Sequence, residues 1–478
     1  MSFPQSLVRR YLAPIEFVRP GGYAEIWRIA WPLIAMNASN VVMLLLNRGF
    51  LARHQLEDVT AAVPAGQLFF TLEVFFMVTC GFTGTIVAQN YGKKDFAECT
   101  RTAWNGFFLG CAVGLLLTGL LPPLGEMLLS TGKLSEEILG RQIDYFNTMV
   151  PCSALLCMEV PFYSYFTAIG RTRLVGTVKV ASTLLGVPLN YIFIFGKCGL
   201  PEFGVTGAAL ASTCSMLFSM VTIFTLFATQ RDPRFPVWRC LTFRFDLIRK
   251  IVGFGIPGGL QACVRNSCFA FVILMFSRLG DQAVAAMGLA LTVNQLSFIP
   301  LFGLCDATAV LTGRYIGERH IEVATMLPFR ALRMVMLYFS AAATLFLFVP
   351  EWLLARFQSD TVGSLDFATV AAQVRGILLI LIVQNVFDGI RFIIMGALRG
   401  AGDTHIPLLL ALATNLLVQV PGTILATVVF RLPLWEAWIL SITLYIALDA
   451  LVMVWRRRTG AWKHIRVIDL EEEPAKAA

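Results

Sequence analysis

Three carboxylates lie in apolar stretches of this chain, where a charged group is costly. Asp388 stands in the middle of residues 380–394, Glu73 is flanked by phenylalanines, and Asp306 precedes a short apolar run. Holding a charge at the centre of a bilayer costs at least ~2.5 kcal/mol, so such residues usually line an aqueous cavity or an ion path. We therefore regard Asp388, Glu73 and Asp306 as candidates for coupling to a cation.

Two arginines lie at comparable positions inside apolar segments. Arg391 follows Asp388 by three residues, which places the two on one face of a helix. At 1.5 Å per residue, depth from the basic end of each segment matches Arg265 with Asp388 and Arg391 with Asp306. These pairs could be structural or could act in gating, and a paired Asp388 would stay ionised and carry protons poorly. A guanidinium fork could also bind an anionic group.

Polar uncharged residues complete the candidate set. Gln384 precedes Asp388 by one helical turn, and Asn47 and Asn190 fall in the outer halves of their segments. With Arg265 and Arg391, they are candidates for substrate contact or gating. Glu73 has two interpretations: it takes up and releases a proton, or it stays protonated and hydrogen-bonds to a neighbouring helix.

The elements that position these residues are long apolar helices. The chain of 478 residues is 57% hydrophobic and 14% charged, with mean hydropathy +0.72, whereas soluble domains carry about 25% charged residues. Segments this long predict helices rather than the short alternating strands of a barrel. The prediction is an all-α polytopic membrane protein with twelve transmembrane helices, at residues 24–52, 61–89, 103–129, 139–168, 173–198, 206–229, 248–278, 284–313, 330–356, 366–398, 405–430 and 434–455.

Basic residues predict the orientation. With the N-terminus in the cytoplasm, most Lys and Arg fall in the tails and in the loops on that same side. The net charge of +8 therefore needs no nucleic-acid partner. We expect a multi-pass protein of the plasma (inner) membrane with both termini cytoplasmic: tail 1–23, N-lobe 24–229, cytoplasmic linker 230–247, C-lobe 248–456 and tail 457–478.

The two lobes repeat one another. A shift of 225 residues places Pro32 on Pro257 and Gly92 on Gly317. Each lobe then has six spans of equal orientation, which predicts two six-helix bundles related by a pseudo-two-fold axis along the membrane normal. Such lobes typically provide alternating access to a central site.

Several motifs resemble those of the multidrug and toxic compound extrusion (MATE) family, in its NorM-like branch. The matching stretches are Trp31-Pro32-Leu33-Ile34, Ala88-Gln89-Asn90-Tyr91-Gly92, the two stretches 187–196 and 201–209, and Met395-Gly396-Ala397-Leu398-Arg399-Gly400-Ala401-Gly402-Asp403-Thr404. The resemblance implies a V-shaped pair of bundles that export amphipathic, typically cationic compounds in exchange for Na⁺ or H⁺. The chain departs from the family pattern at Asn47, where an aspartate is expected, and at Arg265, where a glutamate is expected.

Enzyme signatures are absent from the sequence. Neither the phosphate-loop pattern GxxxxGK[ST] nor HExxH occurs. We therefore expect no enzymatic activity, cofactor, metal or nucleotide, and energy from an ion gradient, with H⁺ favoured over Na⁺. The expected partners are a small organic substrate and the bilayer, and the expected state is a monomer. Two alternatives remain at this point: a lipid-linked precursor flippase, and a non-transporting membrane scaffold or sensor.

Overall fold

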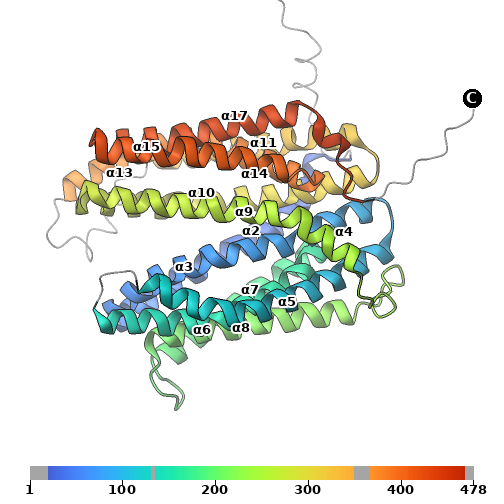
Figure 1. Cartoon of the computed structure of the whole chain (residues 1–478), viewed down its shortest axis with the longest axis horizontal. Coiled ribbons are helices and arrows are strands. Elements are labelled where there is room, and N and C mark those ends of the chain that lie inside the picture. The colour runs from blue at the N-terminus through green and yellow to red at the C-terminus, as the bar shows by residue number, and fades with distance from the viewer. Residues whose placement is uncertain (1–19, 131–134, 349–366, 469–478) are drawn as a thin grey trace, which may run out of the picture.

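The computed structural model describes residues 20–130, 135–348 and 367–468, and these are largely helical (Figure 1). The N-lobe consists of α2 (Tyr23–His54), α3 (Leu56–Gly81), α4 (Thr83–Gly92), α5 (Phe96–Leu129), α6 (Glu136–Ala168), α7 (Thr172–Ile194) and α8 (Gly204–Ala228). The C-lobe consists of α9 (Phe245–Phe276), α10 (Asp281–Gly317), α11 (Ile321–Phe348), α13 (Phe367–Ala401), α14 (His405–Thr414), α15 (Val420–Ile424), α16 (Leu434–Trp438) and α17 (Leu444–Arg458).

Ten helical segments in the described residues are long and apolar enough to cross a membrane. Helices α6 and α11 coincide with the two other expected spans and contain 33 and 28 residues. The expected span 330–356 continues past residue 348, outside the described residues, as do most of the expected tails. The all-α membrane architecture is thus confirmed.

The last two spans contain wide helical turns. Segments Asn415–Gln419, Leu425–Val429 and Ile439–Thr443 are π-helical. In the first, the Val420 N–H bonds to the Asn415 carbonyl, five residues back. Pro421 follows immediately and has no N–H to donate, which leaves a carbonyl of the preceding turn without its usual partner.

The helices of each lobe lie together in Figure 1, the N-lobe below and the C-lobe above. The most extensive contacts between the lobes are those of α2 with α10, α3 with α9, and α4 with α10. The lobe interface is therefore built mainly from the first two spans of each half of the chain.

Two glycines allow the backbones of α4 and α10 to touch. A Cβ atom on Gly92 would overlap the carbonyl oxygen of Arg314, and a Cβ atom on Gly317 would overlap that of Gln89. Gly317 follows Gly92 by 225 residues, and Arg314 follows Gln89 by the same number. The two contacts are thus the same contact made in both directions.

The lobes are joined at one end of the molecule. There the Gln89 amide donates to the Gly400 carbonyl (3.0 Å) and Arg330 donates to the Gly21 carbonyl (2.7 Å). The deepest polar contact joins Asn266 to the hydroxyl of Thr71 (2.5 Å), near the middle of their helices. Beyond it, toward the opposite end, no hydrogen bond or ion pair joins described residues of the two lobes.

Candidate transport site

A buried charge cluster occupies the C-lobe between α13 and α17. The Arg391 guanidinium donates to the Asp388 carboxylate (2.5 Å) and to the Tyr445 hydroxyl (3.1 Å), and lies 3.8 Å from the Asp449 carboxylate. Asp449 in turn accepts from the Thr414 hydroxyl (3.1 Å). Arg391 and Asp388 are 5% and 1% exposed. The one arginine is therefore compensated by two carboxylates from two helices.

Arg265 lies beside this cluster but outside its ion pairs. Its guanidinium sits over the Phe392 ring (5.4 Å to the centroid) and contacts the Met395 sulfur (3.5 Å). Among the described residues, no carboxylate lies within 4.0 Å of it, so the expected pair with Asp388 is wrong. Asp388 is paired along its own helix with Arg391, because three residues bring both side chains onto one face.

The second expected pair is also wrong. Asp306 bonds to Arg399 (2.5 Å) rather than to Arg391, and both side chains of this pair are about one-third exposed. Helix α13 continues to Ala401, so Arg399 projects from the same helix two turns beyond Arg391. The position of a residue along the helix axis gives the depth of its side chain but not the direction in which the side chain points around the axis. The pairs that form depend on that direction.

The amide candidates are divided between the lobes, with Gln384 on α13 and Asn47 and Asn190 on the neighbouring helices α2 and α7. Gln384 accepts from the Trp438 indole (2.9 Å) and from the Thr443 hydroxyl (3.4 Å), which ties α13 to the last span. Asn190 donates to the Gly186 carbonyl (2.9 Å) within α7. The side-chain oxygens of Asn190 and Asn47 are buried, and neither has a hydrogen-bond partner among the described residues.

Glu73 occupies the interior of the N-lobe on α3. Its side chain is 8% exposed, and its Oε1 atom has no hydrogen-bond partner among the described residues. Lys179 on α7 is near enough to interact with Glu73 electrostatically, but Lys179 pairs with Glu159 on α6 (2.7 Å). Ser219 on α8 donates to the other oxygen of Glu159 (2.5 Å). The Lys179 ammonium is thus paired with Glu159, and Glu73 lies outside that ion pair.

The sequence interpretation missed part of both clusters. The Lys179 side chain is 17% exposed and paired inside the lobe rather than extended toward the membrane surface. Asp449 was not assigned a role, although it stands four residues after Tyr445 in an apolar segment. That spacing was the available signal, because residues four apart share a helix face. In the part of the chain that is described, no group of three His, Cys, Asp or Glu could hold a metal ion.

Comparison with known proteins identifies the family. The family model MatE matches residues 32–192 and 257–425, which is more than half of the chain. The chain belongs to the MATE family. Its MATE relatives include the "Probable multidrug resistance protein NorM" of Thermotoga maritima, 26% identical over 440 residues and 91% of each chain. The protein of the same name from Pseudomonas putida is 28% identical over 416 residues, 84% of this chain and 86% of the relative.

Solved structures agree with the assignment. A structure described as the outward-facing conformation of a multidrug resistance MATE family transporter has a TM-score of 0.84 at 20% identity, and covers 95% of this chain and 98% of its own. The resemblance to the NorM-like branch is therefore confirmed. The protein is a multi-pass membrane transporter, and the names of its relatives support multidrug efflux.

Proposed function

We propose that this MATE protein is a secondary active antiporter that exports amphipathic, cationic organic compounds in exchange for H⁺ by alternating access. Twelve helices cross the plasma membrane in two six-helix bundles related by a pseudo-two-fold axis. The reciprocal contacts of Gly92 and Gly317 support this relation. Gly92 contacts Arg314, and their counterparts in the other lobe, Gly317 and Gln89, make the same contact. Such paired contacts are typical of a two-fold interface.

The joined ends of the lobes carry the basic loops. Arg314 and Arg330 lie at this end, as do the basic residues between α8 and α9. By the positive-inside rule this end faces the cytoplasm. The lobes are then closed toward the cytoplasm and unjoined toward the outside, which corresponds to an outward-facing state.

The environment of Glu73 is the main support for coupling to H⁺. A buried carboxyl with one unsatisfied oxygen can take up a proton without further ligands, whereas a hard metal cation requires several oxygens. Lys179 supplies a second state, because its ammonium can compensate Glu73 when Glu73 is ionised. Asp388 and Asp306 can take part only if their pairs with Arg391 and Arg399 separate during the cycle.

The test is efflux of ethidium from vesicles reconstituted with the full chain. Under an imposed pH gradient, we expect Glu73→Gln to reduce the initial rate of ethidium efflux at least about tenfold. We expect a Na⁺ gradient in place of the pH gradient to drive no efflux by the wild-type protein. Glu126→Gln, at an exposed carboxylate of α5, is the matched control and should behave as wild type. Unchanged efflux by Glu73→Gln would remove Glu73 from the coupling step, and drive by Na⁺ alone would reverse the choice of ion.

A second candidate function is export of compounds with an anionic group, such as lipid-linked precursors. It is favoured by Arg265, which is only partly buried and has no carboxylate partner among the described residues. Arg265 is adjacent to Asn266, which forms the deepest polar contact between the lobes. In the same vesicles, an anionic amphipath exported by wild type but not by Arg265→Gln would favour this second function.

A further inference from the structure

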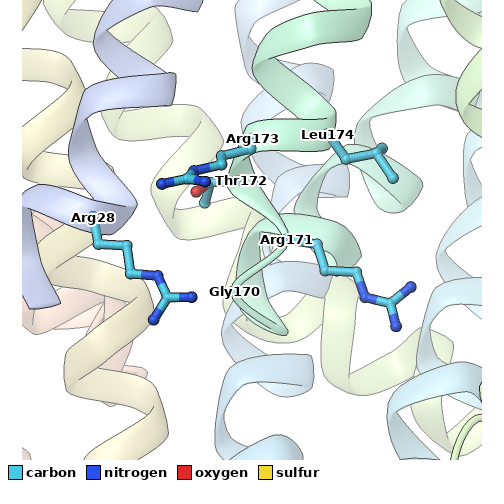
Figure 2. A pocket seen from close by; sticks show the side chains of 6 residues that line it. All are labelled: Arg28, Gly170, Arg171, Thr172, Arg173 and Leu174. Carbon is cyan, nitrogen blue, oxygen red and sulfur yellow. The ribbon is translucent and has the colours of Figure 1, made fainter.

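A pocket opens where α2 and α7 meet at the basic end of the N-lobe. Its volume is about 240 Å³, and it is lined by Arg28, Gly170, Arg171, Thr172, Arg173 and Leu174 (Figure 2). The two helices approach closely because α7 has a glycine at the contact: a Cβ atom on Gly176 would meet the Pro32 carbonyl oxygen at 2.9 Å. The pocket is the widened end of this helix–helix groove.

Two arginines from different helices line the opening. In Figure 2 the side chain of Arg28 on α2 extends toward Gly170, the side chain of Arg173 on α7 extends toward α2, and Arg171 points away. Arg171 is paired with Asp232 (3.2 Å). Among the described residues, neither Arg28 nor Arg173 has a carboxylate within 4.0 Å, so their two charges are uncompensated.

Asp232 cannot neutralise the pocket. Its carboxylate is also held by Arg234 (2.8 Å). The hydrogen bond from the Arg234 guanidinium lowers the pKa of the Asp232 carboxyl to about 2, so Asp232 is ionised at neutral pH but already shared between two arginines. The pocket therefore retains its positive charge and suits an anion that a guanidinium fork can bind through two oxygens.

Two exposed tryptophans show where this pocket lies relative to the bilayer. Trp27 and Trp31 are 53% and 42% exposed and lie one turn apart on α2, on either side of Arg28 in the sequence. The Arg173 guanidinium lies 6.0 Å from the centroid of the Trp31 ring. Exposed tryptophans of membrane proteins concentrate at the level of the lipid headgroups. The cationic pocket is thus at headgroup depth, beside an apolar aromatic surface.

We infer that this pocket binds the phosphate group of an anionic phospholipid from the cytoplasmic leaflet. Arg28 and Arg173 bind the phosphate oxygens, and the acyl chains lie along α2 against Trp27 and Trp31. A free phosphate would use the same two guanidiniums but would gain nothing from the tryptophans. The pocket is on the outside of the N-lobe, so this inference does not depend on the coupling ion or the exported compound.

The experiment is native mass spectrometry of the purified full chain in micelles with equimolar phosphatidylglycerol and phosphatidylcholine. We expect wild type to retain phosphatidylglycerol preferentially. Each arginine near an anionic lipid surface contributes a factor of about five, so R28Q/R173Q should lower that preference about 25-fold. Arg249→Gln, at an exposed arginine near the start of α9, should keep the preference of wild type.

Competition experiments distinguish binding of a phospholipid from binding of free phosphate. Excess glycerol phosphate or inorganic phosphate should displace little phosphatidylglycerol, because neither contacts the tryptophans. Both arginines are exposed, so the variants should fold; circular dichroism checks this, and Arg28→Gln alone serves if the double variant fails. Equal retention of the two lipids by wild type, an unchanged preference in the folded variant, or full displacement by free phosphate would each overturn the inference.

Discussion

Asp388 is paired with a counter-charge on its own helix. Arg391 lies three residues away, and both are almost completely buried. The cost of burying each charge is offset by its attraction to the other charge. Removing one partner of a buried pair therefore costs about 3–5 kcal/mol of stability. The pair therefore has a structural role in addition to any part in coupling.

Asp388→Asn should lower the free energy of unfolding by about 3 kcal/mol. The value lies at the low end of that range because Asp449 still faces Arg391 at 3.8 Å. The measurement is denaturant unfolding in mixed micelles. The triple variant Asp388→Leu/Arg391→Met/Asp449→Asn removes all three charges of the cluster and should recover most of the loss. A fully stable Asp388→Asn protein would show that the pair contributes little.

At the scale of the helix, close backbone contact decides how α4 and α10 meet. Gly317 on α10 leaves room for the Gln89 carbonyl of α4. Gly288 lies on the same helix but has open space around its Cβ position. On α10, the close contact with α4 therefore requires a glycine at position 317 but not at position 288.

Gly317→Ala should weaken the joined end of the lobes, because the new methyl group overlaps backbone that cannot move independently. Overpacking typically costs about 1–3 kcal/mol, so a maleimide should label Thr85→Cys at the interface about fivefold faster or more. Gly288→Ala gains helix propensity without a clash and should leave labelling unchanged. Equal rates in the two variants would mean that the glycine contact does not hold the lobes together.

The helices were predictable from the sequence, but their rotation was not. The apolar length that marks residues 366–398 as a span also fixes the depth of Asp388, because rise per residue is constant. The direction of Arg265 around α9 depends on how α9 packs against α3, which no local pattern records. For the same reason the Lys179–Glu159 pair, formed between two helices, was missed while the spacing of Asp388 and Arg391 along one helix was noticed.

For the whole molecule, alternating access requires the joined lobe ends to separate. Ala88 and Gly313 face each other there: a Cβ atom on Gly313 would lie 3.2 Å from the Ala88 Cβ atom. That is near the separation of about 3.5–4.5 Å found in disulfides. A covalent bond at this point would hold the lobes closed toward the cytoplasm.

Ala88→Cys/Gly313→Cys should form a disulfide under mild oxidation and lose transport in proportion to the crosslinked fraction. Reduction should restore the rate. The measurement pairs vesicle efflux with mass spectrometry of the crosslinked peptide, since the chain also has 11 native cysteines. Each single variant under the same oxidant is the control. Full crosslinking with undiminished efflux would contradict alternating access.

The mutual contact of Gly92 and Gly317 has a consequence for the history of this gene. If the two lobes descend from one ancestral lobe that formed a homodimer, a single codon supplied both glycines, and a mutation there changed both contacts at once. In the present chain each glycine can be mutated separately. Gln89 and Arg314 differ in their side chains, although their carbonyl groups make the same contact with the opposing glycine.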